Sequence, residues 1–383
     1  MMFDSPCAIV RIALVTEFCP PYRTGFYETF ANRYDTKVFF CDTRDRWQAF
    51  GDFDYEVIRG IRLKDRYRLA PELFLRLRQY GPDVVVGSPV EGFGGQSAYL
   101  YTKATDTPFV LWTGEWHLPL TTLRTITFPL IKRIYDEADA IAAYGPHVRS
   151  YLSDLGVDPG KVSLAWNSVD TEAFSDPEPS RAHAVLDRYD VPDGAPIALY
   201  VGRLVREKGI DYLIDAFDRV HEDDTVSSDP HLFIVGDGDR RTELEQQASH
   251  IDHVTFTGRV DNAELPGYYA AANAFILPSI RTEVFREPWG LVVNEAMSAG
   301  TPVIATGQVG AAAAGIVSHG RNGFVVPERN VSTLAEQLAT LLDDEALSER
   351  MGRRAADDIA EYDYDRMVGG FSEAFERVFD GRR

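Results

Sequence analysis

Short apolar segments alternate with amphipathic ones through the first half of the chain. The apolar segments cover residues 8–16, 36–40, 83–87, 108–112 and 139–143, and segments with helical periodicity lie near 26–33, 70–80, 95–105, 121–138 and 147–155. Apolar runs of this length predict strands buried on both faces. Their alternation with helices predicts an α/β fold with a parallel, doubly wound sheet.

The second half of the chain repeats the pattern. Strands are predicted at 196–202, 231–236, 253–257, 275–278 and 302–305, and helices at about 209–220, 240–250, 290–299, 331–343, 345–360 and 364–379. The turn-rich segment DRYDVPDGA separates the two halves, because Pro and Gly favour turns. We therefore predict one domain at 1–190, a second at 191–363, and a final helix within 364–383 that packs back towards the first domain.

The charge balance narrows the classes of partner. The 383 residues include 59 acidic and 39 basic side chains, for a formal net charge of -20, and lysine is scarce. Nucleic acid is a poor partner for such a surface, because affinity for it comes mainly from neutralising phosphates. An acid-rich, lysine-poor composition is typical of proteins from salt-loving organisms, where dense salt screens the repulsion between like charges.

The cysteine content and the hydropathy of the chain indicate the cellular compartment in which the protein works. Cys7, Cys19 and Cys41 show no CxxC spacing, which argues against a zinc module and for a reducing environment. No segment near the start combines a basic region with an apolar core of signal length, and no apolar run approaches the ~18 residues of a spanning helix. We expect a cytoplasmic protein.

Contact with the cytoplasmic face of a membrane stays an open alternative. Basic residues stand among apolar ones in the segments 69–80 and 121–138, namely Arg76, Arg78, Arg124, Lys132 and Arg133. Such faces can rest on an anionic membrane. Ordinary surface helices show the same pattern, and the net charge opposes adhesion.

The stretch 275–306 (FILPSIRTEVFREPWGLVVNEAMSAGTPVIAT) holds the strongest candidate site. It predicts a strand, a polar loop at the carboxyl edge of the sheet, a short helix from about Gly290 and a second strand, and α/β folds bind ligands at that edge. Glu287 precedes the helix and Glu295 lies inside it, up to about 12 Å away. The helix start favours an anion and the carboxylates suit sugar hydroxyls, which fits a nucleotide-sugar. The alternative is that Glu287 only caps the helix and Glu295 is only a solvated helix residue.

Two cations are predicted at the same edge of the sheet. The first strand of the second half runs into Arg203, and Lys208 stands at the start of the following helix. Two fixed cations beside a helix terminus can stabilise a diphosphate in place of a metal ion. The alternative is that Arg203 and Arg206 make surface pairs with Glu207 or Asp211.

Loops after the strands of the first half carry groups that suit sugars. Glu91, Glu115 and His117 supply hydrogen-bond acceptors and a titratable ring, and Trp112 and Trp116 offer faces for stacking. The alternative is that the tryptophans belong to the core or a domain interface and that His117 is a loop histidine with its bonds satisfied.

Several glycines follow predicted strands. Gly25 lies in a plausible phosphate-facing turn, although the fingerprint G-x-G-x-x-G is absent. Gly236 opens a tight turn, and backbone from Gly258 to Val260 could contact a nucleobase edge. The small residues of 307–315 allow close approach of backbone to a ligand.

Asp237 and Asp239 form an Asp-x-Asp pattern at a strand end. Such a pair can hold a divalent metal on a diphosphate. We interpret the segment as a glycine turn whose Asp239 caps the next helix.

These segments together resemble a family 4 glycosyltransferase of the two-domain GT-B fold. The resemblance covers nearly all of residues 8–380 and is carried between 197 and 327 by YVGRLVREKG, VGDGD, FTGRV, EPWGLVVNEAMSAGTPVIAT and HGRNGFVVP. It implies two Rossmann-like domains facing a deep cleft, the first for the acceptor and the second for the nucleotide-sugar. The chain departs from the family in the alanines of 310–315, where a Gly-Gly pair and a Glu are usual, and in its single glycine at 20–25.

The resemblance also implies residue roles. Arg203 and Lys208 would hold the donor diphosphate, Glu295 the ribose and Glu287 the transferred sugar, while His117 would line the cleft. The predicted catalytic residues are Glu287, Lys208, Arg203 and His117, and the predicted substrate-binding residues are Glu295, Gly290, Leu291, Trp289, Gly25, Gly258, Val260, Gly236 and Glu91.

We therefore expect a retaining glycosyltransferase that moves a sugar from a UDP-sugar or GDP-mannose to an acceptor hydroxyl or phosphate. The acceptor is expected to be a lipid-linked or cell-envelope glycan, and no metal or other cofactor is expected. The alternatives are a metal-dependent transferase that uses Asp237 and Asp239, and a non-catalytic nucleotide-sugar-binding protein or partner subunit. An oxidoreductase would need the dinucleotide fingerprint that is missing.

Overall fold

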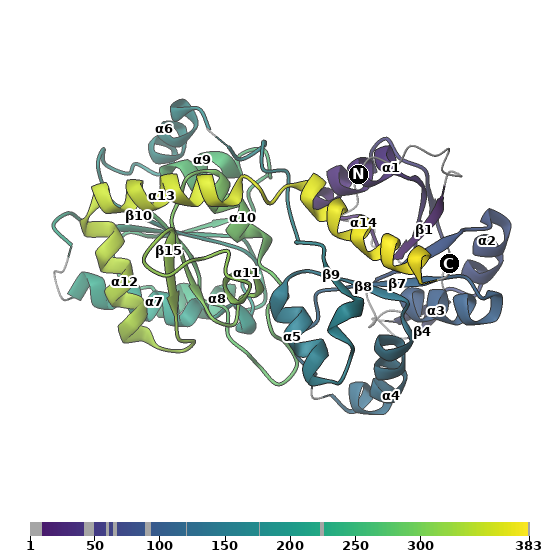
Figure 1. The fold of residues 1–383 in the computed structure, drawn as a ribbon. Coiled ribbons are helices and arrows are strands. Elements are labelled where there is room, and N and C mark those ends of the chain that lie inside the picture. Colours follow the sequence, from purple (N-terminus) through teal and green to yellow (C-terminus); the bar gives the residue numbers. More distant parts are fainter. Residues whose placement is uncertain are drawn as a thin grey trace. The chain divides into compact units, whose positions relative to one another are not determined.

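The computed structural model describes residues 10–41, 50–58, 61–63, 67–88, 93–119, 121–175, 177–222 and 226–381. The chain divides into two compact units (Figure 1). Unit 1 contains Met1–Trp116, Leu120–Val169 and Tyr364–Arg383, and unit 2 contains His117–Pro119 and Asp170–Asp363. The chain thus enters unit 2 earlier than the joint expected near residue 190, because α6 (Pro179–Arg188) packs against α9 (Leu265–Ala271) of unit 2.

Unit 1 is built on a seven-stranded sheet of order β3-β2-β1-β6-β7-β8-β9. All pairings in this sheet are parallel, as predicted from the apolar runs. A separate antiparallel hairpin is formed by β4 and β5. The strands are β1 (Arg11–Thr16), β2 (Asp35–Phe40), β3 (Tyr55–Val57), β4 (Ile61–Leu63), β5 (Tyr67–Leu69), β6 (Val84–Gly87), β7 (Phe109–Thr113), β8 (Ala140–Ala143) and β9 (Val162–Leu164).

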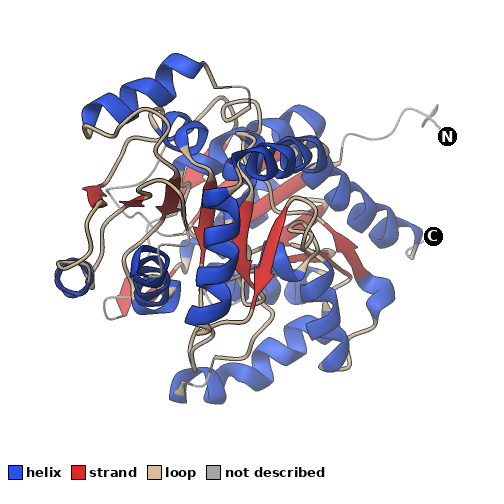
Figure 2. Ribbon diagram, turned by 90° about the vertical axis from the view of Figure 1, so that its left-hand side faces the viewer, coloured by secondary structure: helices blue, strands red, loops and turns tan. Residues whose placement is uncertain are grey.

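Helices cover both faces of the unit 1 sheet, and Figure 2 colours the helices and strands of the whole described chain differently. Side chains of α2, α3, α4 and α5 share one buried cluster, and side chains of α1 and α14 share the other. The helices are α1 (Thr24–Arg33), α2 (Glu72–Tyr80), α3 (Phe93–Thr105), α4 (Thr122–Glu137), α5 (Pro146–Asp154) and α14 (Tyr364–Asp380). The sheet is therefore doubly wound.

The last helix, α14, packs on unit 1, as the sequence predicts. The ring of Phe371 lies 5.8 Å from Phe26, 5.2 Å from Phe30 and 5.7 Å from Trp112, measured between ring centroids. These aromatic rings are buried, so the helix completes the core of unit 1. Trp112 is accordingly a core residue rather than a platform for sugar.

Unit 2 contains a six-stranded sheet of order β12-β11-β10-β13-β14-β15, again with parallel pairings. Its strands are β10 (Ile197–Val201), β11 (His231–Val235), β12 (Val254–Gly258), β13 (Ala274–Leu277), β14 (Val303–Thr306) and β15 (Gly323–Val326). In Figure 1, α6, α9, α10 and α13 lie on one side of this sheet and α7 and α8 on the other. The remaining helices are α7 (Ile210–Glu222), α8 (Arg241–Gln247), α10 (Leu291–Ser298), α11 (Gly310–Ala313), α12 (Val331–Asp343) and α13 (Glu345–Ile359).

The strand order of unit 2 reverses between β10 and β13, and α/β sheets bind ligands at the carboxyl ends of strands at such a point. The two loops that leave these strands pack on each other. The N–H of Ile280 donates to the carbonyl of Glu207 at 2.9 Å, and a Cβ on Gly209 would lie 2.2 Å from the carbonyl oxygen of Pro278. The topology thus brings together two loops that are about 70 residues apart in the chain, as expected where a parallel sheet reverses its order.

Among the helices of the described ranges, none combines the length and the apolar composition that crossing a bilayer would require.

Candidate functional site

Lys208 and Glu287 form a buried ion pair at the point where the strand order of unit 2 reverses. Lys208 ends a one-turn helix after β10, and Glu287 belongs to the loop after β13. The Lys208 ammonium donates to Glu287 Oε2, which also accepts from the hydroxyl of Ser279 at 3.4 Å. Glu287 is therefore the partner of a cation and not the helix cap that the sequence left as an alternative.

Glu295 is buried inside unit 2, on the second turn of α10. Its Oε2 accepts a hydrogen bond of 2.7 Å from the hydroxyl of Tyr269, which lies on α9. Burial raises the pKa of the Glu295 carboxyl from 4.5 to about 7, and the Tyr269 bond opposes this increase. Glu295 is thus not the solvated helix residue that was the alternative interpretation.

The start of α10 is formed by Gly290 and Leu291. Gly290 is the N-cap with φ 88°, and a Cβ there would lie 2.8 Å from Cδ2 of Leu277 and 3.0 Å from Cγ1 of Val309. Only glycine suits this conformation and this space. Because glycine has no side chain to cap the helix, the first N–H groups of α10 remain suited to an anion.

Trp289 lies beside the helix start, with its side chain in the core. It is 1% exposed, and its indole N–H donates to Oδ1 of Asn294 at 2.8 Å. Its side chain therefore fixes the loop against α10, and a role in substrate binding would fall to its backbone.

Arg203 follows β10 at the same edge of the sheet. Its side chain is 66% exposed and lies 3.6 Å from Glu207, and its carbonyl accepts a bond of 2.9 Å from the hydroxyl of Tyr200. The surface pair with Glu207 that the sequence offered as an alternative is thus present. A pair this exposed contributes little to stability, so a ligand can displace it at low cost.

Gly236 follows β11, Gly258 ends the adjoining strand β12, and the two residues bond to each other. The N–H of Gly236 donates to the carbonyl of Gly258 at 2.8 Å, and a Cβ on Gly236 would lie 1.8 Å from the carbonyl oxygen of Gly202. Gly236 is therefore required by the packing of neighbouring strand ends. Val260 is half-buried two residues further on.

The expected helix cap at Asp239 is wrong. Helix α8 begins after Arg240, and its N-cap makes no side-chain hydrogen bond. Asp237 instead accepts the N–H of Gly238 at 2.8 Å, a turn within the loop. Across the described ranges, no three His, Cys, Asp or Glu side chains are grouped so that they could hold a metal ion.

The small-residue segment 307–315 contains a short helix, α11, where a loop was expected. A Cβ on Gly310 would lie 2.1 Å from the carbonyl oxygen of Pro288, and the N–H of Gly310 donates to the carbonyl of Glu287 at 3.1 Å. The close approach that this glycine allows is therefore to the loop that carries Glu287.

His117 belongs to unit 2, although the sequence placed it in the first domain. Its Nε2 lies 3.3 Å from the carbonyl oxygen of Glu283. Burial, followed by the charge of Arg281, lowers the pKa of the His117 ring. The lowered pKa favours the neutral ring, which lies against the same loop as Glu287.

The predicted residues Gly25 and Glu115 belong to unit 1, whereas Lys208 and Glu287 belong to unit 2. Gly25 lies in the first turn of α1 against Tyr364, whose Cε2 would be 2.6 Å from a Cβ at that position. Glu91 lies outside the described residues. Glu115 forms a buried ion pair with Arg124 and accepts a bond of 2.8 Å from the hydroxyl of Tyr135, so it is structural.

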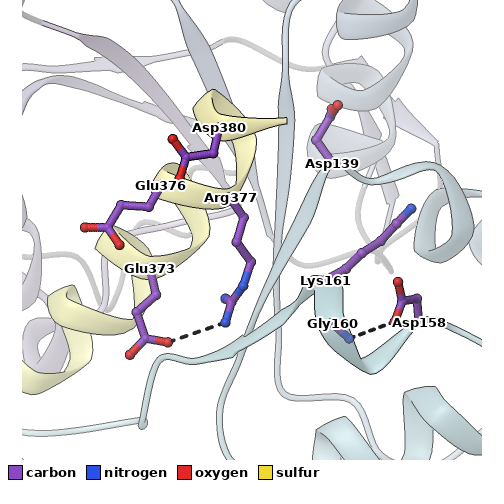
Figure 3. A pocket seen from close by; sticks show the side chains of 8 residues that line it. All are labelled: Asp139, Asp158, Gly160, Lys161, Glu373, Glu376, Arg377 and Asp380. Atoms are coloured by element: carbon purple, nitrogen blue, oxygen red, sulfur yellow. Dashed lines mark hydrogen bonds and ion pairs between the residues drawn. The ribbon is translucent and has the colours of Figure 1, made fainter. Parts of the chain in front are cut away.

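A surface hollow of about 530 Å³ on unit 1 has a different character (Figure 3). Lys161 at its rim donates to the carbonyl of Asp136 at 2.9 Å, and Arg377 lies 3.8 Å from Glu373. The hollow is lined by Asp139, Asp158, Gly160, Lys161, Glu373, Glu376, Arg377 and Asp380. Its carboxylates outnumber its cations, so it does not suit a diphosphate.

Two residues of the site were not predicted from the sequence. Tyr269 donates a hydrogen bond to Glu295, and Ser279 donates one to Glu287. Ser279 is next to the predicted strand end, and this position could have suggested it. Tyr269 meets Glu295 through the packing of α9 on α10, for which the sequence carries no motif.

Comparison with known proteins shows which family models the chain matches. The family model "Glycosyl transferases group 1" matches residues 186–358, and the model "Glycosyltransferase Family 4" matches residues 28–173. The first match contains Lys208, Glu287 and Glu295.

Curated relatives are similar over part of their length. A GDP-mannose-dependent alpha-(1-6)-phosphatidylinositol monomannoside mannosyltransferase of Mycobacterium tuberculosis is 32% identical over 58% of this chain and 57% of its own length. Sulfoquinovosyl transferase SQD2 of Arabidopsis thaliana is 28% identical over 77% of this chain and 57% of its own. The chain therefore spans little more than half the length of these relatives.

Solved structures share the fold over their whole length. Anabaena HepE in complex with UDP and glucose superposes with a TM-score of 0.75 at 18% identity, covering 96% of this chain and 99% of that one. Sucrose-phosphate synthase of Thermosynechococcus elongatus gives a TM-score of 0.77 at 22% identity, covering 97% and 100%. These likenesses and the two parallel-sheet units confirm the predicted GT-B fold. With family matches over both units, the chain belongs to the family 4 glycosyltransferases.

Proposed function

We propose that this chain transfers a sugar from a UDP- or GDP-linked donor to an acceptor hydroxyl or phosphate, with retention of anomeric configuration and without a metal ion. The observation that carries the proposal is the convergence of Lys208, Glu287 and the start of α10 where the sheet of unit 2 reverses its order. A cation, an acceptor and the N–H groups of a helix start within one pair of loops match the successive groups of a nucleotide-sugar.

The donor diphosphate would lie on the first N–H groups of α10, next to Lys208. A charge-assisted hydrogen bond contributes about 1.5–3 kcal/mol, and helix N–H groups favour the negative charge further. Arg203 at the same edge would supply a second cation, because its exposed pair with Glu207 is weak.

Binding of the donor would change the partner of Lys208. Lys208 pairs with Glu287 in the structure. A diphosphate of greater charge would draw the ammonium away, and Glu287 would then accept hydrogen bonds from hydroxyls of the transferred sugar. Glu295, which lies on α10, would accept hydrogen bonds from the ribose hydroxyls.

The chemical step we propose is a displacement on one face of the sugar. The bond between the anomeric carbon and the diphosphate oxygen breaks, and a bond to the acceptor oxygen forms. The acceptor proton passes to the leaving phosphate oxygen, and the nucleoside diphosphate departs. Lys208 and α10 stabilise the charge that grows on the leaving group, which lowers the barrier.

Relatives support the choice of donors and the class of acceptor. One relative is named for GDP-mannose and a phosphatidylinositol mannoside, and one structural neighbour is described with UDP and glucose. We therefore propose a lipid-linked or cell-envelope glycan as the acceptor, and a cytoplasmic protein that meets it at the membrane surface.

The decisive experiment is a panel of UDP- and GDP-sugars scored by the thermal midpoint, followed by an assay of nucleotide release with candidate acceptors. We expect one base to raise the midpoint and nucleotide release to need an acceptor. Undiminished release in excess chelator would support the absence of a metal, and loss of release would favour the pair Asp237 and Asp239. Donor binding without release for any acceptor would identify a nucleotide-sugar-binding protein instead.

A further inference from the structure

Two arginines flank a tight turn in the loop that carries Glu287. The N–H of Thr282 donates to the carbonyl of Phe285 at 2.9 Å, and the N–H of Phe285 donates to the hydroxyl oxygen of Thr282 at 3.0 Å. These bonds close the turn, so the residues on either side of it, Arg281 and Arg286, lie opposite each other. Like charges in opposed positions repel, and the fold nevertheless holds the two arginines together.

The positive charge of this pair is only partly compensated within the fold. Arg286 is half-buried, and burial together with the charge of Arg281 lowers the pKa of Arg286 from 12.5 to about 10. The charge of Glu328 opposes this shift, but its carboxylate already pairs with Arg329 and accepts the backbone N–H of Arg281 at 2.9 Å. The side chain of Arg281 is exposed and forms no ion pair with any other residue that the structure describes.

His117 lies against the same turn. Its Nε2 is 3.3 Å from the carbonyl oxygen of Glu283, whose own side chain is exposed at the tip of the turn. Burial, then the charges of Arg281 and of Arg286, lower the pKa of the His117 ring. A ring that both guanidinium groups affect in this way lies close to each of them. We call Arg281, Arg286 and His117 the turn cluster.

The turn cluster adjoins the proposed donor site. The hydroxyl of Ser279 donates to Glu287 at 3.4 Å, so the two ends of the loop meet at the base of the turn. Consecutive Cα atoms are about 3.8 Å apart, which sets the distance from Arg286 to Glu287 along the backbone. Because the proposed function assigns the transferred sugar to Glu287, that sugar is within the reach of an arginine side chain.

The chemistry of the turn cluster suits an oxyanion. A guanidinium group is a planar fork that binds carboxylates and phosphates through two parallel hydrogen bonds. A neutral hydroxyl would leave the charges of both arginines beside each other. The donor diphosphate is already assigned to Lys208 and the start of α10, so a second anion would belong to another part of the substrate.

We propose that Arg281 and Arg286 bind a carboxylate on the transferred sugar, so that the donor is a nucleotide-linked hexuronic acid. The inference rests on the proposed function, because it takes Glu287 as a ligand of that sugar. A carboxylate on the donor fits better than a phosphate on the acceptor, because the two arginines belong to the same loop of unit 2 as Glu287.

The test compares nucleotide-sugars that differ only at C6 of the sugar. UDP-glucose is paired with UDP-glucuronate, and GDP-mannose with GDP-mannuronate. The apparent Kd of each is taken from the thermal midpoint of the full chain at increasing concentrations. With the base that the chain binds, we expect the hexuronate to bind about tenfold or more tightly than the hexose, because its carboxylate gains charge-assisted hydrogen bonds.

Variants of the two arginines connect this preference with the turn cluster. Arg281→Gln keeps the fold intact, because the side chain it replaces is exposed. Both Arg281→Gln and Arg286→Gln should reduce the preference to about threefold or less and leave binding of the hexose nearly unchanged. Arg286→Lys should retain part of the preference, because the charge stays while the fork is lost. The control Arg353→Gln, at an exposed position of α13, should retain all of it.

The ring of His117 provides a measurement that does not depend on turnover. A carboxylate between the arginines would cancel part of the charge that lowers the pKa of His117, so the hexuronate should raise that pKa more than the hexose does. Arg281→Gln should raise it without any ligand. An NMR titration of the imidazole signals measures these shifts, with His117→Gln to assign the resonance.

Other results would overturn the inference. Equal or weaker binding of the hexuronate would exclude a carboxylate site, while binding and release with the neutral sugar would leave the proposed function intact. A preference that survives both Arg281→Gln and Arg286→Gln would place the carboxylate elsewhere. If these variants lowered nucleotide release only with a phosphate-bearing acceptor, the anion would belong to the acceptor. If neither kind of nucleotide-sugar changed the midpoint, the proposed function would fail and this inference with it.

Discussion

The two glutamates of the site, Glu287 and Glu295, have different surroundings. Glu287 faces the ammonium of Lys208, whereas Glu295 is buried and accepts from the neutral hydroxyl of Tyr269. A carboxylate beside a cation is favoured in its charged form, and a buried one without a cation is favoured in its neutral form. The same residue type therefore occurs once beside a cation and once in a buried position where its pKa is raised.

Glu295 predicts a pH dependence of stability. Its pKa is raised from 4.5 to about 7, so between these values the folded chain retains a proton that the unfolded chain releases. The free energy of unfolding should fall by up to about 3 kcal/mol as pH rises through this window. Thermal midpoints measured from pH 5 to 8 should fall less for Glu295→Gln than for the parent chain. Parallel curves for the two proteins would show that Glu295 does not titrate there.

The position of Lys208 predicts that its removal lowers turnover. Lys208→Ala should lower turnover about 10²-fold or more, because the ammonium stabilises charge on the leaving diphosphate. The control is Arg206→Ala, which removes an exposed cation from the same short helix. Steady-state assays with the donor identified by the thermal-shift panel would measure the turnover of both variants. Unchanged turnover in Lys208→Ala would remove Lys208 from the mechanism.

At the scale of elements, the backbone at Gly290 fixes how α10 starts. Gly290→Ala would place a methyl group 2.8 Å from Leu277 in a left-handed conformation. We expect a loss of about 1–3 kcal/mol in the free energy of unfolding and weaker donor binding. Gly307→Ala is the control, because a Cβ there meets no atom within 4 Å. Denaturant titration measures both, and equal stabilities would show that the loop adjusts around the methyl group.

Most of the parallel strands could be predicted because they are apolar runs between polar segments. Short elements escaped this criterion: β9 has only three residues, and α9 contains Pro and Gly near its start. The loops of Lys208 and Glu287 could be placed at one sheet edge from the alternation of strands and helices. Their direct pairing could not, because it depends on how Gly209 packs against Pro278.

The boundary between the two units also could not be predicted from local sequence. Turn residues near 190 marked a joint, but α6 packs on α9, and contacts between distant segments carry no local pattern. His117 likewise joins unit 2 through the loop at Glu283, whereas its neighbours in sequence suggested the first half.

At the scale of the molecule, unit 1 depends on a helix from the other end of the described chain. Phe371 of α14 is fully buried against Phe26, Phe30 and Trp112. Phe371→Ala should cost about 3–5 kcal/mol in the free energy of unfolding. Gly369→Ala on the same helix meets no atom within 4 Å and should be neutral or slightly stabilising. Calorimetry should show the loss in the transition of unit 1, and a loss confined to the transition of unit 2 would contradict this assignment.

The net charge of the molecule predicts a salt dependence. With a formal charge of -20, repulsion between carboxylates opposes folding, and salt shortens its range from about 10 Å at 0.1 M to about 3 Å at 1 M. The thermal midpoint should rise by several degrees when KCl is raised across this range. A midpoint that falls or stays constant would remove self-repulsion as a main influence on stability.

The return of α14 to unit 1 sets an order of events on the ribosome. The segment Asp170–Asp363 contains all but three residues of unit 2 and is made before Tyr364–Asp380, whereas the sheet of unit 1, made first, waits for that helix before one of its faces is covered. The later half can therefore complete its fold before the earlier one. The apolar face that α14 will cover is the part of the nascent chain with most need of a chaperone.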